Sequence, residues 1–107
     1  MEKTTALPDT GSETREQFTP LFNVVLLDDN DHTYDYVIEM LTKLFGRTPE
    51  QAFLMACEVD TAERVIVDTT SKERAELKRD QIHAFGADRL IALSKGSMSA
   101  SIEPEMA

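Results

Sequence analysis

Four polar residues in succession, Asp28-Asp29-Asn30-Asp31, form the densest group of chemically active side chains in this sequence. They separate a short apolar run from an amphipathic segment, and successive short polar side chains favour a loop. Several carboxylates that meet beside an apolar pocket can hold an ammonium group. A solvated acidic turn is the simpler interpretation, and the spacing alone leaves both open.

Other chemistry at these acids is disfavoured by the sequence. A calcium loop requires a glycine at its sixth position, and the D-x-N-x-D pattern is incomplete here. A paired-carboxylate hydrolase requires a distinct acid and base, and no oxyanion donor is visible. His32 and His83 are too few for a metal site, and Cys57 lies among apolar residues typical of packing. We therefore expect no metal, no cofactor and no catalytic residue.

The elements around the acids can be read from hydrophobic periodicity. The run LFNVVLL, Leu21–Leu27, is short and β-rich, which predicts a buried strand. After the loop, apolar residues at helical spacing predict a helix that begins near Tyr34 and buries one face. Gly46 stands where the left-handed residue that ends this helix is expected.

The next segment begins with a strong helix-start signal. In Thr48-Pro49-Glu50-Gln51, threonine can cap the helix, proline suits its first turn and glutamine can complete a capping box. We expect the buried side of this helix to consist of Ala52, Phe53, Ala56 and Val59. A second strand, Arg64–Val67, follows.

A similar cap signal, Thr70-Ser71-Lys72-Glu73, predicts a third helix that ends near Phe85. Its expected apolar face is thin, consisting of Ala75, Leu77, Ile82 and Phe85. Farther on, Leu90–Leu93 is apolar, and Met98–Ile102 alternates like an edge strand that Pro104 ends. The order β-α-α-β-α-β predicts an α+β fold, with three helices on one face of a small antiparallel three-stranded sheet.

Composition limits the class of partner. The chain has 107 residues, enough for one domain, and a net charge of −9 that would repel nucleic acid and anionic membranes. A single cysteine favours a reducing compartment, and there is no apolar leader or membrane span, so we expect a cytoplasmic protein. Residues 1–20 are poor in large apolar side chains and are expected to form a flexible extension before a domain at 21–107.

These motifs, taken in order, resemble the ClpS family. The resemblance rests on VVLLDDNDHTYDYVIEMLTKLFG, the Thr-Pro-Glu-Gln helix, VDTAERVIV and SKERAELK, and it spans about Phe22 to Phe85. It implies a non-enzymatic adaptor of the Clp protease. Such an adaptor binds proteins with a destabilising N-terminal residue (an N-degron) and passes them to an AAA+ unfoldase of the ClpA or ClpC type.

The resemblance also implies which residues form the site. In the family an Asn-Asp-Asp signature and a histidine hold the substrate α-amine. Asp28, Asp29 and Asn30 stand at the signature and Asp60 at the histidine, so the ammonium would meet a cup of Asp28, Asp29 and Asp60. A side-chain pocket is expected to be lined by Asn30, Tyr34, Val37, Ala56, Val59 and Met98.

In this resemblance Tyr34 replaces a gate methionine and Ala56 a lining methionine, so the pocket is expected to be reshaped, and Tyr34 could close it. Glu73 and Lys78 match the pair through which the family docks its unfoldase. The extension of residues 1–20 would take part in handover of the substrate.

Three alternatives remain open at this point. One is a divergent Clp regulator that docks on the unfoldase without recognising N-termini. Another is a ribosomal-stalk-type interaction domain, which has a similar small α+β form. An acidic hydrolase that uses Asp29 is the third.

Overall fold

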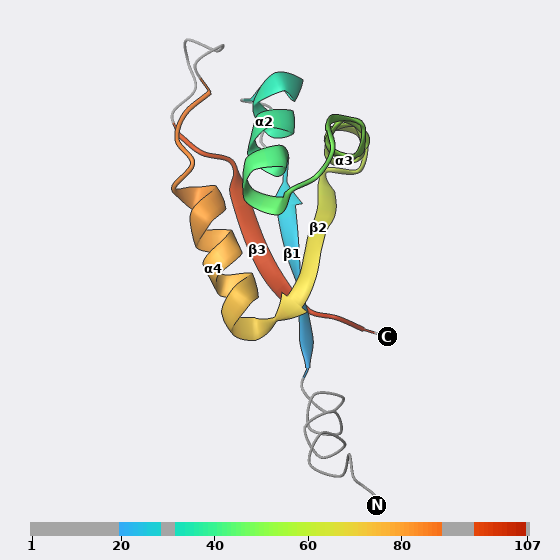
Figure 1. Ribbon diagram of the computed structural model, residues 1–107. Coiled ribbons are helices and arrows are strands. Elements are labelled where there is room, and N and C mark those ends of the chain that lie inside the picture. Colours follow the sequence, from blue (N-terminus) through green and yellow to red (C-terminus); the bar gives the residue numbers. More distant parts are fainter. Residues whose placement is uncertain (1–19, 29–31, 89–95, 107) are drawn as a thin grey trace, which may run out of the picture.

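The structure, a computed structural model, describes residues 20–28, 32–88 and 96–106. Six elements follow one another in these ranges: β1 (Leu21–Leu27), α2 (Tyr34–Phe45), α3 (Pro49–Ala62), β2 (Arg64–Ser71), α4 (Lys72–His83) and β3 (Ser99–Pro104). The predicted α+β class and element order are confirmed (Figure 1).

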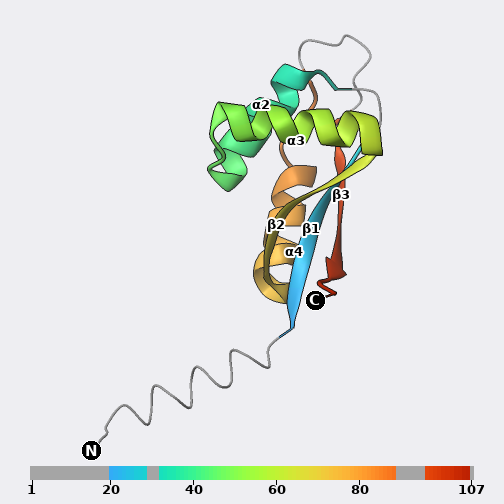
Figure 2. The same ribbon diagram turned by 90° about the vertical axis from the view of Figure 1, so that its right-hand side faces the viewer.

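The sheet has the strand order β2-β1-β3, and both pairs are antiparallel. β1 takes the centre because its apolar run can be buried from both sides, and Val24, Val25 and Leu26 are almost inaccessible to solvent. β3 lies at an edge, as its alternating pattern predicts. In Figure 2, which views the molecule from a direction at right angles to Figure 1, α2 and α4 lie on one side of the sheet.

A single hydrophobic core forms between the sheet and the helices. Val24 and Leu26 of β1 meet Met40 and Leu41 of α2 in this core. The other elements each contribute small or branched side chains, among them Ala52, Ala56 and Val59 of α3, Val65 and Val67 of β2, Ala75 and Ile82 of α4, and Ala100 of β3.

The helix ends agree closely with the sequence signals. Thr48 and Gln51 form the predicted capping box, with both hydrogen bonds at 3.1 Å. Gly46 has φ of +65° and ends α2, a conformation that favours glycine because a Cβ would be strained there. Local hydrogen bonding therefore decides these boundaries.

The third predicted helix begins one residue later than its cap signal suggested, and the strand before it is longer than predicted. β2 continues to Ser71, and the Ser71 hydroxyl, rather than that of Thr70, accepts from the Arg74 N–H to cap α4. α4 ends at His83, and Phe85 packs against the core from the segment that follows. The strand extends because β1 offers backbone partners as far as Leu21.

Two side chains predicted to be buried are exposed. Phe53 on α3 is 47% exposed, and Leu77 on α4 is 50% exposed. Each helix buries only a narrow stripe, which consists of Ala52, Ala56 and Val59 in α3 and of Ala75 and Ile82 in α4. The predicted face was too wide in both helices.

Some predictions concern residues that the structure does not describe. Residues 1–19 of the predicted extension and the apolar stretch Leu90–Leu93 lie outside the described ranges. Within those ranges, no helix has the length and apolar character needed to cross a bilayer.

The contrast between two leucines tests this account of the core. Leu41 is 0% exposed, and Leu41→Ala should lower the free energy of unfolding by about 3 kcal/mol because it leaves a cavity. Leu77→Ala should change it by less than about 0.5 kcal/mol, since that side chain is half exposed on a helix that tolerates alanine. Urea denaturation of both variants gives the two values. Equal losses of unfolding free energy in the two variants would contradict the exposed position of Leu77.

Candidate functional site

The end of β1 is tied to the end of α3. The backbone N–H of Asp28, the first residue after β1, donates to the carbonyl oxygen of Glu63 at 3.1 Å. Glu63 follows α3 in a left-handed conformation, with φ of +69°, and its own N–H donates to the Val59 carbonyl oxygen. The acidic loop therefore starts beside the helix turn that carries Asp60.

Tyr34 connects the start of α2 to the same turn. Its hydroxyl donates to Oδ2 of Asp60 at 2.7 Å, and its ring lies 5.9 Å from the ring of Phe53 at a tilt of 54°. The hydrogen bond to Asp60, with smaller contributions from burial and Cys57, raises the pKa of Tyr34 to about 12. Tyr34 thus lies along α3 and holds the carboxylate near the end of that helix.

Asp60 has an unusual electrostatic position. It lies in the last turn of α3, where the helix carbonyls point outward and carry partial negative charge. This last turn contains no basic residue. A carboxylate there is disfavoured by the helix dipole, and a cation that approached it would be attracted by both the carboxylate and the carbonyls. This combination suits an ammonium group.

The predicted pocket-lining residues belong to the core. Val37, Ala56, Val59 and Met98 come from α2, α3 and the segment before β3, and each is at least 96% buried. Tyr34, in contrast, is 37% exposed. A bulky ligand side chain can reach the four residues only after a side chain nearer the surface moves.

Asp29 and Asn30 lie outside the described residues, so the three-carboxylate cup stays a prediction. The structure does tie the Asp28 N–H to Glu63, the residue that follows α3, and the Tyr34 hydroxyl to Asp60 in the last turn of that helix. These residues come from three elements, and their proximity is a property of the fold rather than of one motif.

The two predicted docking residues have different environments. Glu73 is exposed in the first turn of α4. Lys78 is half-buried, and its Nζ donates to the carbonyl oxygen of Leu44 at 2.6 Å and lies 5.4 Å from the ring of Phe45. Lys78 therefore satisfies a terminal carbonyl of α2 and joins α4 to α2.

Sequence reasoning missed the neighbours of Tyr34. Phe53, Cys57 and Asp60 are spaced four and three residues apart, which places them on one side of α3. This spacing is visible in the sequence. The predicted burial of Phe53 hides this stripe.

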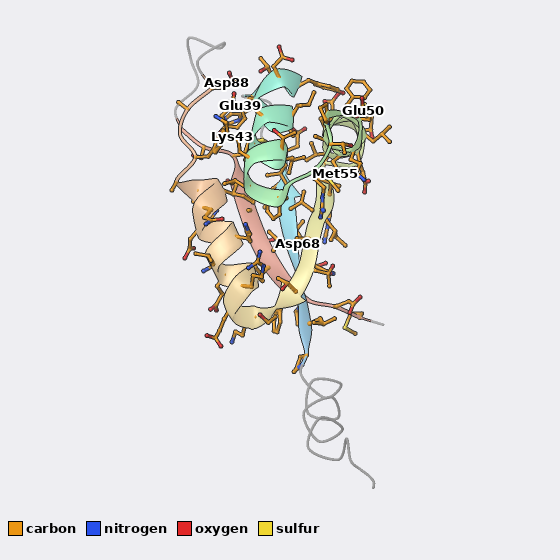
Figure 3. The ribbon with its side chains drawn as sticks, viewed as in Figure 1. Glu39, Lys43, Glu50, Met55, Asp68 and Asp88 are labelled. Atoms are coloured by element: carbon orange, nitrogen blue, oxygen red, sulfur yellow. The ribbon has the colours of Figure 1, made fainter. Side chains whose placement is uncertain are left out.

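A separate hollow lies on another side of α2. It has a volume of about 380 Å³, and Glu39, Lys43 and Asp88 line it together with the rings of Tyr36 and Phe85. Figure 3 shows these three charged residues along α2 and the segment that follows α4. Lys43 pairs with Glu39 at 2.7 Å, and Oδ2 of Asp88 accepts from the Thr33 N–H at 2.6 Å. These two interactions support the middle and the start of α2, respectively.

The pKa of Tyr34 tests the bond to Asp60. The bond stabilises the protonated phenol, so its contribution to stability is present below pH 10 and is lost as the pH rises towards about 12. Asp60→Asn should lower the pKa of Tyr34 towards 10, measured by NMR titration of ¹³C-labelled tyrosine. Asp80→Asn on α4 is the control. An unchanged pKa in Asp60→Asn would contradict the contact.

Comparison with known proteins agrees with this architecture. The family model for "ATP-dependent Clp protease adaptor protein ClpS" matches residues 17–93. The adapter protein ClpS of Desulforapulum autotrophicum is 28% identical over 72% of this chain and 74% of its own length. The adapter protein ClpS of Aromatoleum aromaticum is 33% identical over 68% of this chain and 72% of its own length.

A solved structure has the same fold. Agrobacterium tumefaciens ClpS2, bound to L-phenylalaninamide, superposes with a TM-score of 0.69 at 19% sequence identity, over 80% of this chain and 98% of that one. The family match covers most of the described elements, including β1, all three helices and β2. The chain therefore belongs to the ClpS family of adaptor proteins of the ATP-dependent Clp protease.

Proposed function

We propose that this adaptor binds proteins through a free N-terminal α-amine and the first side chain, and delivers them to a Clp AAA+ unfoldase of the ClpA or ClpC type. The observation that carries the proposal is the position of Asp60. It stands at the negative end of α3, next to the start of α2 and the end of β1.

The chemistry of an N-terminus fits this position. An α-amino group has a pKa of about 7.7–8.0 and is mostly cationic at neutral pH. Asp60 and the terminal carbonyls of α3 supply negative charge. Asp28 and Asp29 are proposed to supply two further carboxylates from the acidic loop. The ligand named with ClpS2, L-phenylalaninamide, likewise has a free α-amine and a bulky apolar side chain.

Tyr34 would control access to this site. Its hydroxyl already bonds Oδ2 of Asp60, so an incoming ammonium must replace that donor or share the carboxylate with it. A carboxylate offers two oxygens and about four acceptor positions, so either arrangement is chemically reasonable. Displacing Tyr34 would also open a route towards Val37 and Ala56, which are proposed to line the side-chain pocket with Val59, Met98 and Asn30.

The Tyr34–Asp60 bond also supports a second candidate function. If Tyr34 stays in place, the protein would be a Clp regulator that docks on the unfoldase without binding N-termini. The dependence of binding on a free α-amine separates the two functions.

Peptides that differ only in their first residue provide the test. A peptide with a bulky first residue and a free amine should bind at least about tenfold more tightly than its N-acetylated form, because acetylation removes the charge that Asp60 would meet. Fluorescence anisotropy with the full chain measures both affinities. Equal affinities would reject N-terminal recognition and favour the second candidate.

Variants at the hydrogen bond make this experiment specific. Tyr34→Ala should tighten binding of the free-amine peptide, because it removes a competing donor and the ring that covers the site. Asp60→Asn should weaken the same binding, and Asp80→Asn is the matched control on α4. No change in Tyr34→Ala would show that Tyr34 does not close the site.

Docking on the unfoldase is proposed to use α4, with Glu73 and Lys78 as its charged pair. Glu73 is exposed and available to a partner, whereas Lys78 also holds the end of α2. If Lys78 also contacts the unfoldase, its side chain is already held in place by the bond to Leu44. This arrangement gives the two residues different roles in an experiment.

Charge reversal separates these roles. Glu73→Lys should weaken binding to the unfoldase by about tenfold and leave the melting temperature unchanged, because the side chain is exposed. Lys78→Glu should weaken binding and lower the melting temperature, since it removes the donor to the Leu44 carbonyl oxygen. Glu50→Lys on α3 is the matched control. If Glu73→Lys binds the unfoldase as tightly as the parent protein does, this part of α4 takes no part in docking.

A further inference from the structure

The outer side of α3 carries large apolar residues that the fold leaves uncovered. Phe53 is 47% exposed and Leu54 is 67% exposed. Together with Pro49 and Glu50 they line a hollow of about 380 Å³ with mostly apolar walls. Figure 3 shows Glu50 at this helix, on the side away from α2. Apolar groups that gather around a hollow on the surface are typical of a binding surface.

A line of residues along α3 connects this hollow with the candidate amine site. Asp60, Cys57 and Phe53 are three and four residues apart along α3, so they form one stripe on the helix surface. Tyr34 lies along the stripe, because its hydroxyl contacts Asp60 and its ring lies beside that of Phe53. A chain bound at Asp60 could therefore continue along α3 to the hollow.

The charged residues of α3 itself are all acidic. Within Pro49–Ala62 the charged residues are Glu50, Glu58 and Asp60, and the helix contains no lysine, arginine or histidine. All three acids are exposed. A polypeptide with basic residues would be attracted to this surface, and one with acidic residues would be repelled.

We propose that the outer side of α3 binds the polypeptide segment that follows the N-terminal residue of the captured protein, and that the hollow at Leu54 takes an apolar side chain from it. This inference rests on the proposed function, because it assumes that the N-terminal amine is held near Asp60. It adds a substrate class, namely N-terminal segments with an apolar residue at a fixed distance and basic rather than acidic neighbours.

The distance follows from helix and strand geometry. Phe53 and Pro49 lie seven and eleven positions before Asp60, which corresponds to about 10 and 16 Å along α3 at 1.5 Å per residue. An extended peptide advances about 3.3 Å per residue. With the first residue at Asp60, the fourth residue reaches Phe53 and the fifth reaches the middle of the hollow, about 13 Å away. The side chain that enters the hollow is therefore expected to be that of the fourth or fifth residue.

A positional scan tests this distance. Eight-residue peptides with a fixed bulky first residue and a free amine carry one leucine at each position from two to seven, in a glycine and serine background. With the full chain, fluorescence anisotropy should give a Kd about fivefold lower for leucine at position four or five, the gain expected from burying roughly 40 Å² of apolar surface. Equal affinity at every position would overturn the proposal.

Two leucines of this chain give a matched pair of variants. Leu54→Ser should abolish the preference for position four or five, whereas Leu77→Ser, at a similarly exposed leucine on α4, should retain it. Circular dichroism checks that both variants are folded. If Leu54→Ser keeps the positional preference, or instead weakens only binding to the unfoldase, the hollow serves another partner and the proposal is wrong.

The charge requirement is tested with the best peptide of the scan. Replacing its neighbours at positions three and six by lysine should tighten binding, and replacing them by glutamate should weaken it. The difference should shrink as salt is raised from 50 to about 500 mM, because surface charges are screened. A preference for glutamate would contradict an acidic binding surface.

A single-residue ligand separates failure of this inference from failure of the proposed function. L-phenylalaninamide has an amine and a side chain but is too short to reach the hollow, so Leu54→Ser should not change its affinity. If L-phenylalaninamide binds but the Kd is the same for leucine at every peptide position, only the proposal for the hollow on α3 fails. If neither it nor any free-amine peptide binds more tightly than its acetylated form, the proposed function fails as well.

Discussion

A carboxylate at the negative end of a helix is the feature on which the candidate site depends. Asp60 stands in the last turn of α3 without a basic neighbour in that turn, where the helix dipole disfavours a negative charge. The Tyr34 hydroxyl satisfies one of its oxygens and joins α2 to α3. The Asp28 N–H ties the end of β1 to the residue that follows α3. Three elements therefore meet where a cation would be attracted.

Tyr34 and Asp60 both depart from the pattern that the family resemblance implies, and the structure shows that they depart together. Methionine has no O–H group, so a methionine in place of Tyr34 could not donate to the residue at position 60. Tyrosine can, and a carboxylate is a stronger acceptor than a neutral histidine. In this chain the two residues form a matched donor and acceptor.

The two outer helices present different surfaces. α4 is mostly charged, and its Lys78 completes the end of α2, so part of this helix is structural. α3 presents acids and uncovered apolar side chains, and no residue within it is basic. A small sheet cannot cover both helices completely, because each contributes only a narrow buried stripe. The uncovered side of each helix is available for partners.

The sequence alone determined the elements whose causes are local. The apolar run predicts β1, the capping box starts α3 and Gly46 ends α2, because these depend on hydrogen bonds and backbone preferences within a few residues. Tertiary structure decided which side of α3 is buried. In Ala52–Cys57 apolar residues point in every direction, so periodicity cannot choose a face and the exposure of Phe53 was missed. It also decided the Tyr34–Asp60 contact, since residues 26 positions apart meet only when α2 packs on α3.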